Sequence, residues 1–382
     1  MPPHLMLVTK RHLISGASML VECCVIVALK SMRDMQQMER SSPLAFASWP
    51  LHNRDCRRRL MRSSPFRIRQ IEDYHLSPMK AAVYTKGTLG KVLEIKDLEQ
   101  PVPRDNEVVI RVCAASVNPL DWRMKSQRPG VDVAGQVAAV GRRATQFTPG
   151  DGVFGVCQGA FAEYACAPED KFVRKPESVS FDYAAALPIA GLTALQGLRD
   201  KGHLQPGQKV LINGAAGGIG TFAVQIAKSF GANVTGVCST KNVELVRSLG
   251  ADRVIDYTRD DFTHDSERYD LLLDNAANRS LSEMRRVLTP KGKCVMAGAP
   301  KQLWPLLSRL LKVFTWSPFL KQKFTFFIAK MNRDDLTTLC ALIKAGKLTP
   351  VIDRRYSLAE SASAIAYVEQ GHARAKVVIM FQ

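Results

Sequence analysis

The chain has 382 residues, 46% of them hydrophobic and 23% charged, which is the composition of a globular protein long enough for two or three domains. Its formal net charge of +18 favours anionic ligands such as phosphorylated cofactors. No basic run is interleaved with aromatic residues in the part expected to fold, which argues against nucleic-acid binding. Its nine cysteines form no C-x-x-C pair, which indicates a reducing compartment and argues against a disulfide framework and a cysteine-rich zinc site.

The first 78 residues differ in character from the rest. The apolar run Ile14–Leu29 is interrupted by Glu22, is too short to span a bilayer comfortably, and is followed by no small-residue cleavage site. Met79 then begins MKAAVY, which has the character of a natural start. We therefore expect residues 1–78 to be a disordered, non-folding extension of a cytoplasmic protein without a membrane span. An arginine-rich organellar transit peptide is the alternative.

From Met79 the sequence predicts a run of short strands separated by glycine and proline turns, which is typical of a small barrel-like domain. The expected strands are Ala81–Tyr84, Val92–Ile95, Val108–Ser116, Val131–Val140, Val153–Val156, Phe161–Cys166 and Lys171–Arg174.

Beyond Phe181 strands alternate with helices, which predicts a doubly wound parallel sheet. Tyr183–Leu198 has helical composition, and residues 303–327 are apolar and aromatic without a clear assignment. The alternation comprises strand Val210–Asn213, helix Gly220–Phe230, strand Asn233–Cys238, helix Val243–Leu249, strand Arg253–Asp256, and then Tyr269–Asp274, Ser280–Leu288 and Gly292–Ala297. Helices at Asp334–Ala345 and Ala359–Gln370 precede a last strand, Ala375–Phe381, which we expect to rejoin the barrel.

The stretch Val210–Gly220, VLINGAAGGIG, joins an apolar run to a glycine-rich turn and an apolar helix start. This arrangement binds a dinucleotide, because glycines let the backbone approach a pyrophosphate and the first helical turn offers unpaired N–H groups. Such glycines also fit a simple tight turn, but the strands that follow at βαβ spacing favour the dinucleotide site. The candidate cofactor-binding residues here are Gly214, Ala216, Gly217, Gly218, Ile219 and Gly220.

The end of the next expected strand indicates which cofactor binds. An NAD-preferring site carries Asp or Glu about twenty residues past the glycines, whereas this strand runs into Ser239, Thr240 and Lys241. Hydroxyl groups and a lysine suit a 2′-phosphate, because the ammonium supplies charge and the hydroxyls donate hydrogen bonds. A capped helix N-terminus also explains these residues and is compatible with an anion site. We therefore expect NADPH.

Motifs spread along the chain from Met79 to Gln382 resemble the medium-chain dehydrogenase/reductase superfamily, in particular its zinc-free quinone oxidoreductase branch. They are ASVNPLDW (Ala115–Trp122), RPGVDVAGQVAAVG (Arg128–Gly141), PGDGVFG (Pro149–Gly155), AFAEYA (Ala160–Ala165), ALPIAGLTA (Ala186–Ala194), NGAAGGIG (Asn213–Gly220), LGADRVIDY (Leu249–Tyr257) and GHARAKVVI (Gly371–Ile379). The resemblance implies an α/β protein with a GroES-like β-barrel catalytic domain, residues 79–185 with 332–382. A Rossmann domain that binds NADPH, residues 186–331, interrupts it, and the active site lies in the cleft between the two.

The resemblance also implies roles for single residues. Lys241 and Tyr257 match positions that grip the 2′-phosphate, and Thr193 matches a position beside the nicotinamide. Arg374 and Lys376 are expected to be solvated rather than to reach the cofactor phosphate. The remaining cofactor contacts that the resemblance implies are Gly298, Ala299, Phe327 and Ala329.

Zinc-dependent relatives carry a cysteine, a His-Glu pair and a second cysteine or similar ligand. The corresponding positions here are Asn118, Val131 with Asp132, and Ala190. This set cannot hold zinc as thiolates and imidazoles do, so we expect no metal. Without such a Lewis acid, hydride transfer to a quinone or an α,β-unsaturated carbonyl is favoured over alcohol oxidation, because a conjugated acceptor delocalises the arriving charge.

Three residues of the ASVNPLDW motif are candidates for this chemistry. Asn118 is suited to donate a hydrogen bond to the developing oxyanion or to a ribose hydroxyl, and Asp121 to orient Asn118 or relay a proton. Trp122 is a candidate lining residue of the substrate pocket. A capped turn explains Asn118 and Asp121 as well, and a buried aromatic explains Trp122.

The expected function is therefore that of a zinc-independent, NADPH-dependent reductase of quinones or of enals and enones, in a family that commonly forms homodimers. Only Arg123–Gln127 stand where relatives carry a longer insertion, which predicts a more open pocket or a missing part of the gene. An enoyl-thioester reductase is one alternative, although the short loop argues against its deep acyl pocket. A non-enzymatic nucleic-acid or interaction protein that keeps the fold is the other.

Overall fold

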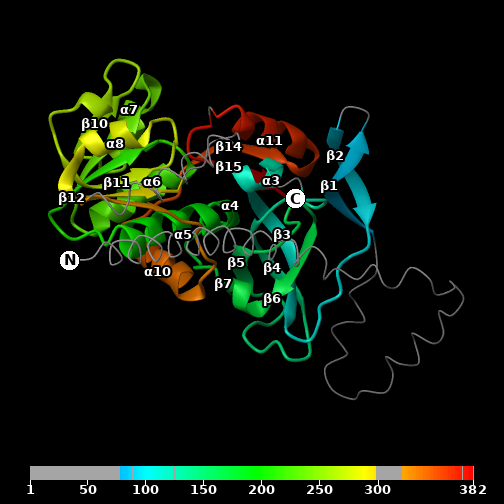
Figure 1. Ribbon diagram of the computed structural model, residues 1–382. Helices are drawn as coiled ribbons and strands as arrows, with labels where there is room; N and C mark the ends of the chain where they lie inside the picture. Colours follow the sequence, from blue (N-terminus) through cyan, green and yellow to red (C-terminus); the bar gives the residue numbers. More distant parts are fainter. Residues whose placement is uncertain (1–77, 88–89, 124–125, 298–320, 372, 382) are drawn as a thin grey trace, which may run out of the picture. The chain divides into compact units, whose positions relative to one another are not determined.

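The computed structural model describes residues 78–381, apart from 88–89, 124–125, 298–320 and 372. The extension expected at residues 1–78 lies outside this range except for Pro78. The described residues contain two large sheets of different kinds, and Figure 1 shows the labelled strands of each. These sheets confirm the expected fold class, whereas the exact domain boundaries at residues 185/186 and 331/332 stay predictions.

The first sheet is mainly antiparallel. Among the described residues it has seven strands, ordered β14-β15-β3-β4-β5-β7 with β6 also paired to β3, and only the β14–β15 pair is parallel. A separate hairpin, β1 with β2, meets it through a bridge between Ala81 and Ala162. The strands are β1 Met79–Gly87, β2 Gly90–Leu98, β3 Glu107–Val117, β4 Asp132–Val140, β5 Gly152–Val156, β6 Tyr164–Pro168, β7 Phe172–Arg174, β14 Ile352–Ser357 and β15 Lys376–Met380.

The second sheet is entirely parallel. Within the described part of the chain its six strands are ordered β10-β9-β8-β11-β12-β13, so the order reverses beside β8, as in a dinucleotide-binding sheet. A ligand of such a sheet binds beyond the carboxyl ends of the strands at this reversal. The strands are β8 Lys209–Asn213, β9 Asn233–Cys238, β10 Arg253–Asp256, β11 Tyr269–Asp274, β12 Leu288–Met296 and β13 Lys323–Phe326.

Both faces of the parallel sheet are covered, because alternate side chains of each strand point to opposite sides. On β8, Val210 and Ile212 belong to a hydrophobic cluster with the helices α5 and α6. Leu211 between them belongs to a second cluster with Met284 of α8. The helical segments are α3 Pro119–Arg123, η2 Glu169–Lys171, α4 Phe181–Ala185, α5 Pro188–Gln196, η3 Gly197–Lys201, α6 Gly218–Ser229, η4 Thr240–Asn242, α7 Val243–Ser248, η5 Phe262–His264, α8 Leu281–Arg286, α10 Arg333–Lys344, η7 Leu358–Glu360 and α11 Ser361–Glu369.

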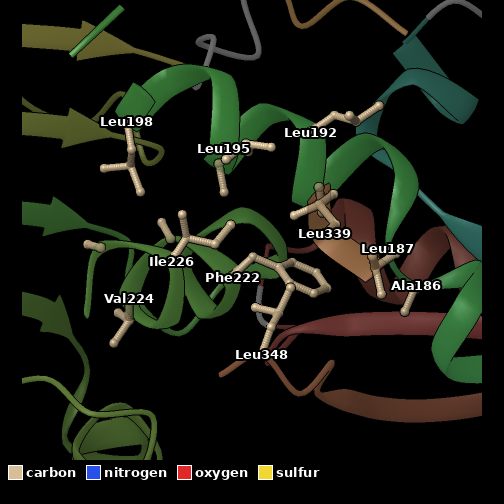
Figure 2. Packing of buried hydrophobic residues seen from close by; sticks show 14 of the residues in the cluster. Ala186, Leu187, Leu192, Leu195, Leu198, Phe222, Val224, Ile226, Leu339 and Leu348 are labelled. Carbon is tan, nitrogen blue, oxygen red and sulfur yellow. The ribbon is translucent and has the colours of Figure 1, made fainter. Parts of the chain in front are cut away.

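The packing of α5 against α6 forms the centre of the larger cluster (Figure 2). Leu195 of α5 points toward α6, which contributes Phe222 and Ile226, and all three side chains are buried. Leu339 of α10 packs into the same cluster, so that the helix following the parallel sheet is tied to its core. This core supports α6, whose first turn lies at the glycine-rich stretch.

Two glutamine side chains fix the path by which the chain leaves the parallel sheet. The side chain of Gln196 accepts a hydrogen bond from the backbone N–H of Lys330 at 2.9 Å and donates one to its carbonyl at 2.8 Å. Gln225 binds both backbone groups of Thr349 in the same way, at 2.8 and 3.0 Å. Each side-chain amide binds both the backbone N–H and the backbone carbonyl of one residue, as a neighbouring strand would. The return path is thereby set from α5 and α6.

The structure differs from the sequence-based expectation at two elements. The helix expected at Tyr183–Leu198 is divided into α4 and α5, because Pro188 has no N–H to donate and starts a new helix. The strand β14 was not expected, because its sequence IDRRYS lacks an apolar alternation. It forms an edge strand, where charged side chains are tolerated. The last strand does rejoin the first sheet, as expected, through its pairing with β3.

We predict that Phe222→Ala lowers the free energy of unfolding by about 3–5 kcal/mol, because truncating a fully buried ring leaves a cavity. Chemical denaturation of the purified protein measures this change. Val102→Ala is the control, because Val102 is 68% exposed and its truncation should change stability by less than about 0.5 kcal/mol. Equal effects of the two substitutions would contradict the core described above.

Candidate cofactor and catalytic site

The glycine-rich turn connects the carboxyl end of β8 to the start of α6. Gly214 has φ of +80°, a conformation that residues with a side chain rarely adopt. A Cβ on Gly220 would lie 2.1 Å from the carbonyl oxygen of Gly214, so only glycine fits there. The turn therefore has the tight path expected of it and ends at the first turn of a 12-residue helix, where N–H groups lack intrahelical partners. Gly217, Gly218 and Ile219 are partly exposed at this point.

Asn275, which follows β11, was not found by the sequence reasoning. A Cβ on Gly214 would lie 3.6 Å from the Cβ of Asn275, so this residue borders the glycine-rich turn. Both polar atoms of its side chain are buried and have no hydrogen-bond partner among the described residues. Neighbouring Asn213 is instead satisfied, since its Nδ2 donates to Asp274 Oδ1 at 2.8 Å. An amide left without partners beside the turn is suited to bind a polar ligand. The position of Asn275 directly after the fourth strand of the alternation is the sequence feature that could have identified it.

The residues expected to bind a 2′-phosphate gather at the carboxyl end of β9. Ser239 is partly exposed, Lys241 is exposed, and Tyr257 has 52% of its surface exposed, with its backbone N–H bonded to the carbonyl of Cys238 at 3.0 Å. Thr240 is committed differently, because its hydroxyl donates to Asp256 Oδ2 at 2.6 Å. This hydrogen bond lowers the pKa of Asp256.

A carboxylate thus lies beside this site, on β10, the neighbour of β9. Asp256 pairs in register with Cys238 across the two parallel strands. Arg259 lies 3.6 Å from its Oδ2 and offsets its charge. The end of β9 itself carries no carboxylate, as the sequence indicated, but its neighbour does.

Across from the turn, the first sheet carries a buried polar cluster around Asn118. The Nδ2 of Asn118 donates to Asp132 Oδ2 at 2.8 Å and to the carbonyl of Ser116 at 3.3 Å. Asp132 is fully buried, and its carboxylate also accepts hydrogen bonds from Ser116 Oγ at 2.8 Å and the backbone N–H of Ile189 at 3.0 Å. Both amide hydrogens of Asn118 therefore have protein acceptors.

The carboxylate of Asp121 connects the backbone before the short loop, at Asn118, to the backbone after it, at Gly130. One carboxylate oxygen accepts the backbone N–H of Asn118 at 2.7 Å, and the other accepts the N–H of Gly130 at 2.9 Å. Burial raises the pKa of Asp121 to about 7, and these two hydrogen bonds oppose the rise. Asp121 thus orients the backbone of Asn118, one of the two roles expected for it.

Lys376, the first residue of β15, also belongs to this cluster, contrary to the expectation from the sequence. It was expected to be solvated, but it is only 3% exposed and its Nζ donates to Asn118 Oδ1 at 2.8 Å. The same Nζ lies 3.5 Å from Asp132 Oδ2. Burial lowers the pKa of Lys376, and the charges of Asp132 and Asp121 oppose this. The pairing of β15 with β3 explains the error, because it brings Lys376 beside the end of β3. Arg374 is exposed, as expected.

The remaining candidates take different positions. Thr193 is 8% exposed and its hydroxyl donates to the carbonyl of Ile189 at 2.6 Å within α5. Trp122 is buried in the core of the first sheet. The ring of Phe327 packs against Gly197, so any contact of Phe327 with a cofactor would come from its main chain. Ala329, two residues further on, is partly buried. Gly298 and Ala299 lie outside the described residues.

The described residues contain no group of three or more His, Cys, Asp or Glu side chains that could hold a metal ion. Over the same residues, no helix is both long enough and apolar enough to cross a membrane.

Two family models match the chain. One, described as alcohol dehydrogenase GroES-like domain, matches residues 104–177, and the other, described as zinc-binding dehydrogenase, matches residues 249–379. The chain is 33% identical over 322 residues to a chloroplast envelope quinone oxidoreductase homolog of Arabidopsis thaliana, covering 78% of this chain and 95% of that protein. It is 31% identical over 328 residues to an NADPH-dependent alkenal/one oxidoreductase, chloroplastic, of the same organism, covering 79% of each.

The solved structure of the quinone oxidoreductase from Coxiella burnetii superimposes with a TM-score of 0.71 at 29% sequence identity. The match covers 80% of this chain and 100% of that one. The GroES-like and parallel-sheet parts described above therefore have counterparts in one known protein, in the same order along the chain.

We predict that kcat/KM falls as the pH drops below about 7, the pKa of Asp121. Above that pH the carboxylate accepts hydrogen bonds from the N–H groups of both Asn118 and Gly130, and protonation weakens these hydrogen bonds. Asp132 raises this pKa and Lys376 lowers it. A pH–rate profile of wild type and Asp121→Asn measures the effect, and the acidic limb should be absent from the variant. Glu177→Gln, which removes an exposed carboxylate, is the control. An unchanged limb in Asp121→Asn would contradict the assignment.

Proposed function

Because the chain belongs to the medium-chain dehydrogenase/reductase superfamily, in its quinone oxidoreductase-like branch, we propose that it is an NADPH-dependent reductase of quinones or of α,β-unsaturated carbonyls. The observation that carries the proposal is the glycine-rich turn at the strand-order reversal. There, Gly220 leaves no room for a side chain, Gly214 has a positive φ that residues with a side chain rarely adopt, and Asn275 presents an unpartnered amide.

The residues present fit a nicotinamide dinucleotide. The first turn of α6 would bind its pyrophosphate, and the amide of Asn275 offers a donor and an acceptor to one of its polar groups. When bound, the nicotinamide supplies the hydride. Ser239, Lys241 and Tyr257 would bind the 2′-phosphate, with Lys241 contributing the positive charge. The hydroxyl of Thr240 already donates a hydrogen bond to Asp256, so Thr240 would contribute less to binding the 2′-phosphate.

Asn118 is the catalytic residue of this proposal, and Asp121 is a positioning residue that acts through it. Asn118 can exchange its 3.3 Å bond to the carbonyl of Ser116 for a hydrogen bond to the developing oxyanion or to a ribose hydroxyl, while its 2.8 Å bond to Asp132 keeps the amide in place. Asp121 fixes the backbone from which Asn118 projects. Trp122, which packs in the core of the first sheet, is the lining residue that we propose for the substrate pocket.

We propose that zinc takes no part, although one matching family model is described as zinc-binding. Asn118 and Asp132 stand at positions where zinc-dependent relatives carry ligands or their neighbours. Here they bind each other and the ammonium group of Lys376, which repels a divalent cation. Without a metal to stabilise an alkoxide, a conjugated acceptor suits the site better, because its own conjugation delocalises the charge that the hydride brings.

The relatives named quinone oxidoreductase and alkenal/one oxidoreductase support acceptors of this class. The same two relatives are named as proteins of the chloroplast envelope and the chloroplast, which favours an organellar location over the cytoplasmic one expected from the sequence. The homodimer that the resemblance implies is also part of this proposal.

We predict that Lys241→Ala weakens NADPH binding by about tenfold to a hundredfold and leaves NADH binding unchanged, because one charged contact to the 2′-phosphate is lost. Asn275→Ala is the matched comparison, and it should weaken both cofactors equally, because its amide borders the glycine-rich turn, where the part common to both cofactors would bind. Asp256→Asn should tighten NADPH alone, because it removes a negative charge beside Thr240. Fluorescence titration measures all three. Tighter binding of NADH than of NADPH by wild type would contradict the 2′-phosphate site.

We predict that the purified protein oxidises NADPH with a quinone, an enal or an enone and not with a saturated aldehyde, and that a chelator leaves the rate unchanged. Absorbance at the NADPH band measures turnover. An enoyl thioester in the same panel tests the alternative reductase. Reduction of the saturated aldehyde that is lost on chelation would contradict the proposal in favour of a zinc dehydrogenase.

A further inference from the structure

We propose that Lys376 is a positioning residue of this reductase, which holds the side chain of Asn118 in a fixed relation to the glycine-rich turn. The inference rests on the proposed function and assigns a part in it to a residue of the C-terminal strand. Lys376 lies between two groups of residues that come from different sheets.

On one side, the segment entering β15 is attached to the glycine-rich turn. The backbone N–H of Ala375 donates to the carbonyl of Ala216 at 2.8 Å, and Ala375 forms an isolated parallel bridge with Gly217. Ala375 has φ of 63°, in the left-handed region that alanine seldom adopts, so this attachment is held against a local backbone preference. The stem of Lys376 continues along the turn, since a Cβ on Gly218 would lie 3.3 Å from its Cδ.

On the other side, the Nζ of Lys376 reaches the catalytic cluster. It donates to Asn118 Oδ1 at 2.8 Å and lies 3.5 Å from Asp132 Oδ2. With its oxygen bound by Lys376, the Asn118 amide presents its two hydrogens to Asp132 and Ser116 and cannot turn over without losing all of these bonds. The orientation of the one amide proposed to donate to the substrate thus depends on Lys376.

A purely structural role would not call for a lysine here. Lys376 is 3% exposed, and a buried ammonium is costly unless it is paired, whereas an unbranched apolar side chain such as methionine would fill the same volume without that cost. The charge matters because two carboxylates, Asp132 and Asp121, are buried in the same cluster. One lysine therefore links the cofactor turn, the proposed hydrogen-bond donor and the local charge balance.

The test compares Lys376→Met with wild type, with Lys344→Met on the exposed side of α10 as the matched control. Misplacement of Asn118 should lower kcat by about a hundredfold. The Kd for NADPH should change by less than about threefold, because the groups that bind the cofactor remain. Loss of NADPH binding with unchanged kcat would overturn the proposal, because Lys376 would then be a cofactor ligand only.

A double-mutant cycle with Asn118→Ala identifies the partner through which Lys376 acts. In the Asn118→Ala background, Lys376→Met should cause little further loss of kcat, because the residue it positions is already absent. Multiplicative losses would overturn the proposal. If Lys376→Met does not fold, the pair Lys376→Met with Asp132→Asn removes both charges together and takes its place in the cycle.

A readout without turnover separates this proposal from the proposed function. The side-chain amide resonance of Asn118, assigned by its absence in Asn118→Ala, should exchange slowly with solvent in wild type and in Lys344→Met and rapidly in Lys376→Met. Unchanged slow exchange in Lys376→Met would overturn the positioning role. A wild-type protein that reduces no acceptor but shows this exchange pattern would refute the proposed activity and leave the positioning of Asn118 standing.

Discussion

The return of the C-terminal strand to the first sheet is the constraint on which the rest of the site depends. β15 pairs with β3, so the residues just before it pass the glycine-rich turn of the parallel sheet. A backbone hydrogen bond from Ala375 to Ala216 joins the two parts, and the side chain of Lys376 carries the connection on to Asn118. A site built from residues of two sheets depends on such a link, because small displacements between reacting groups lower rates steeply.

The charge of the Asn118 cluster follows from this link. Asp132 is fully buried and accepts hydrogen bonds from Ser116, Asn118 and Ile189, so its carboxylate is well solvated by the protein. The ammonium of Lys376 provides the cation nearest to it. This salt bridge includes Asp132, one of the residues that the family resemblance aligns with the metal site of zinc-dependent relatives. It therefore supports our proposal that zinc takes no part and that the acceptor is conjugated.

The sequence was sufficient to predict the parallel sheet, because its strands are short apolar runs separated by glycine turns and helices. β8, β9, β10 and β11 begin or end within one residue of their expected bounds. β14 was not predicted, because Asp353, Arg354 and Arg355 break the apolar pattern of an edge strand that is defined only by its partner β15. The break before α5 was recoverable from Pro188, whose missing N–H ends the preceding helix.

The site was predictable only in part. The glycine turn and Ser239–Lys241 lie in local motifs, and the structure places them at neighbouring strand ends. The role of Asn275 could have been suspected from its place directly after an expected strand of the alternation. The role of Lys376 could not, because its partner Asn118 is 258 positions away along the chain. Its burial is created by the pairing of β15 with β3, which the local sequence does not encode.

Amide hydrogen exchange with and without NADPH tests most directly whether the glycine turn is coupled to the Asn118 cluster through Ala375 and Lys376. We predict that NADPH slows exchange in peptides covering residues 214–220, in those covering 116–121 and in those covering 373–380. Protection confined to residues 214–220, or absent from all three segments, would contradict it.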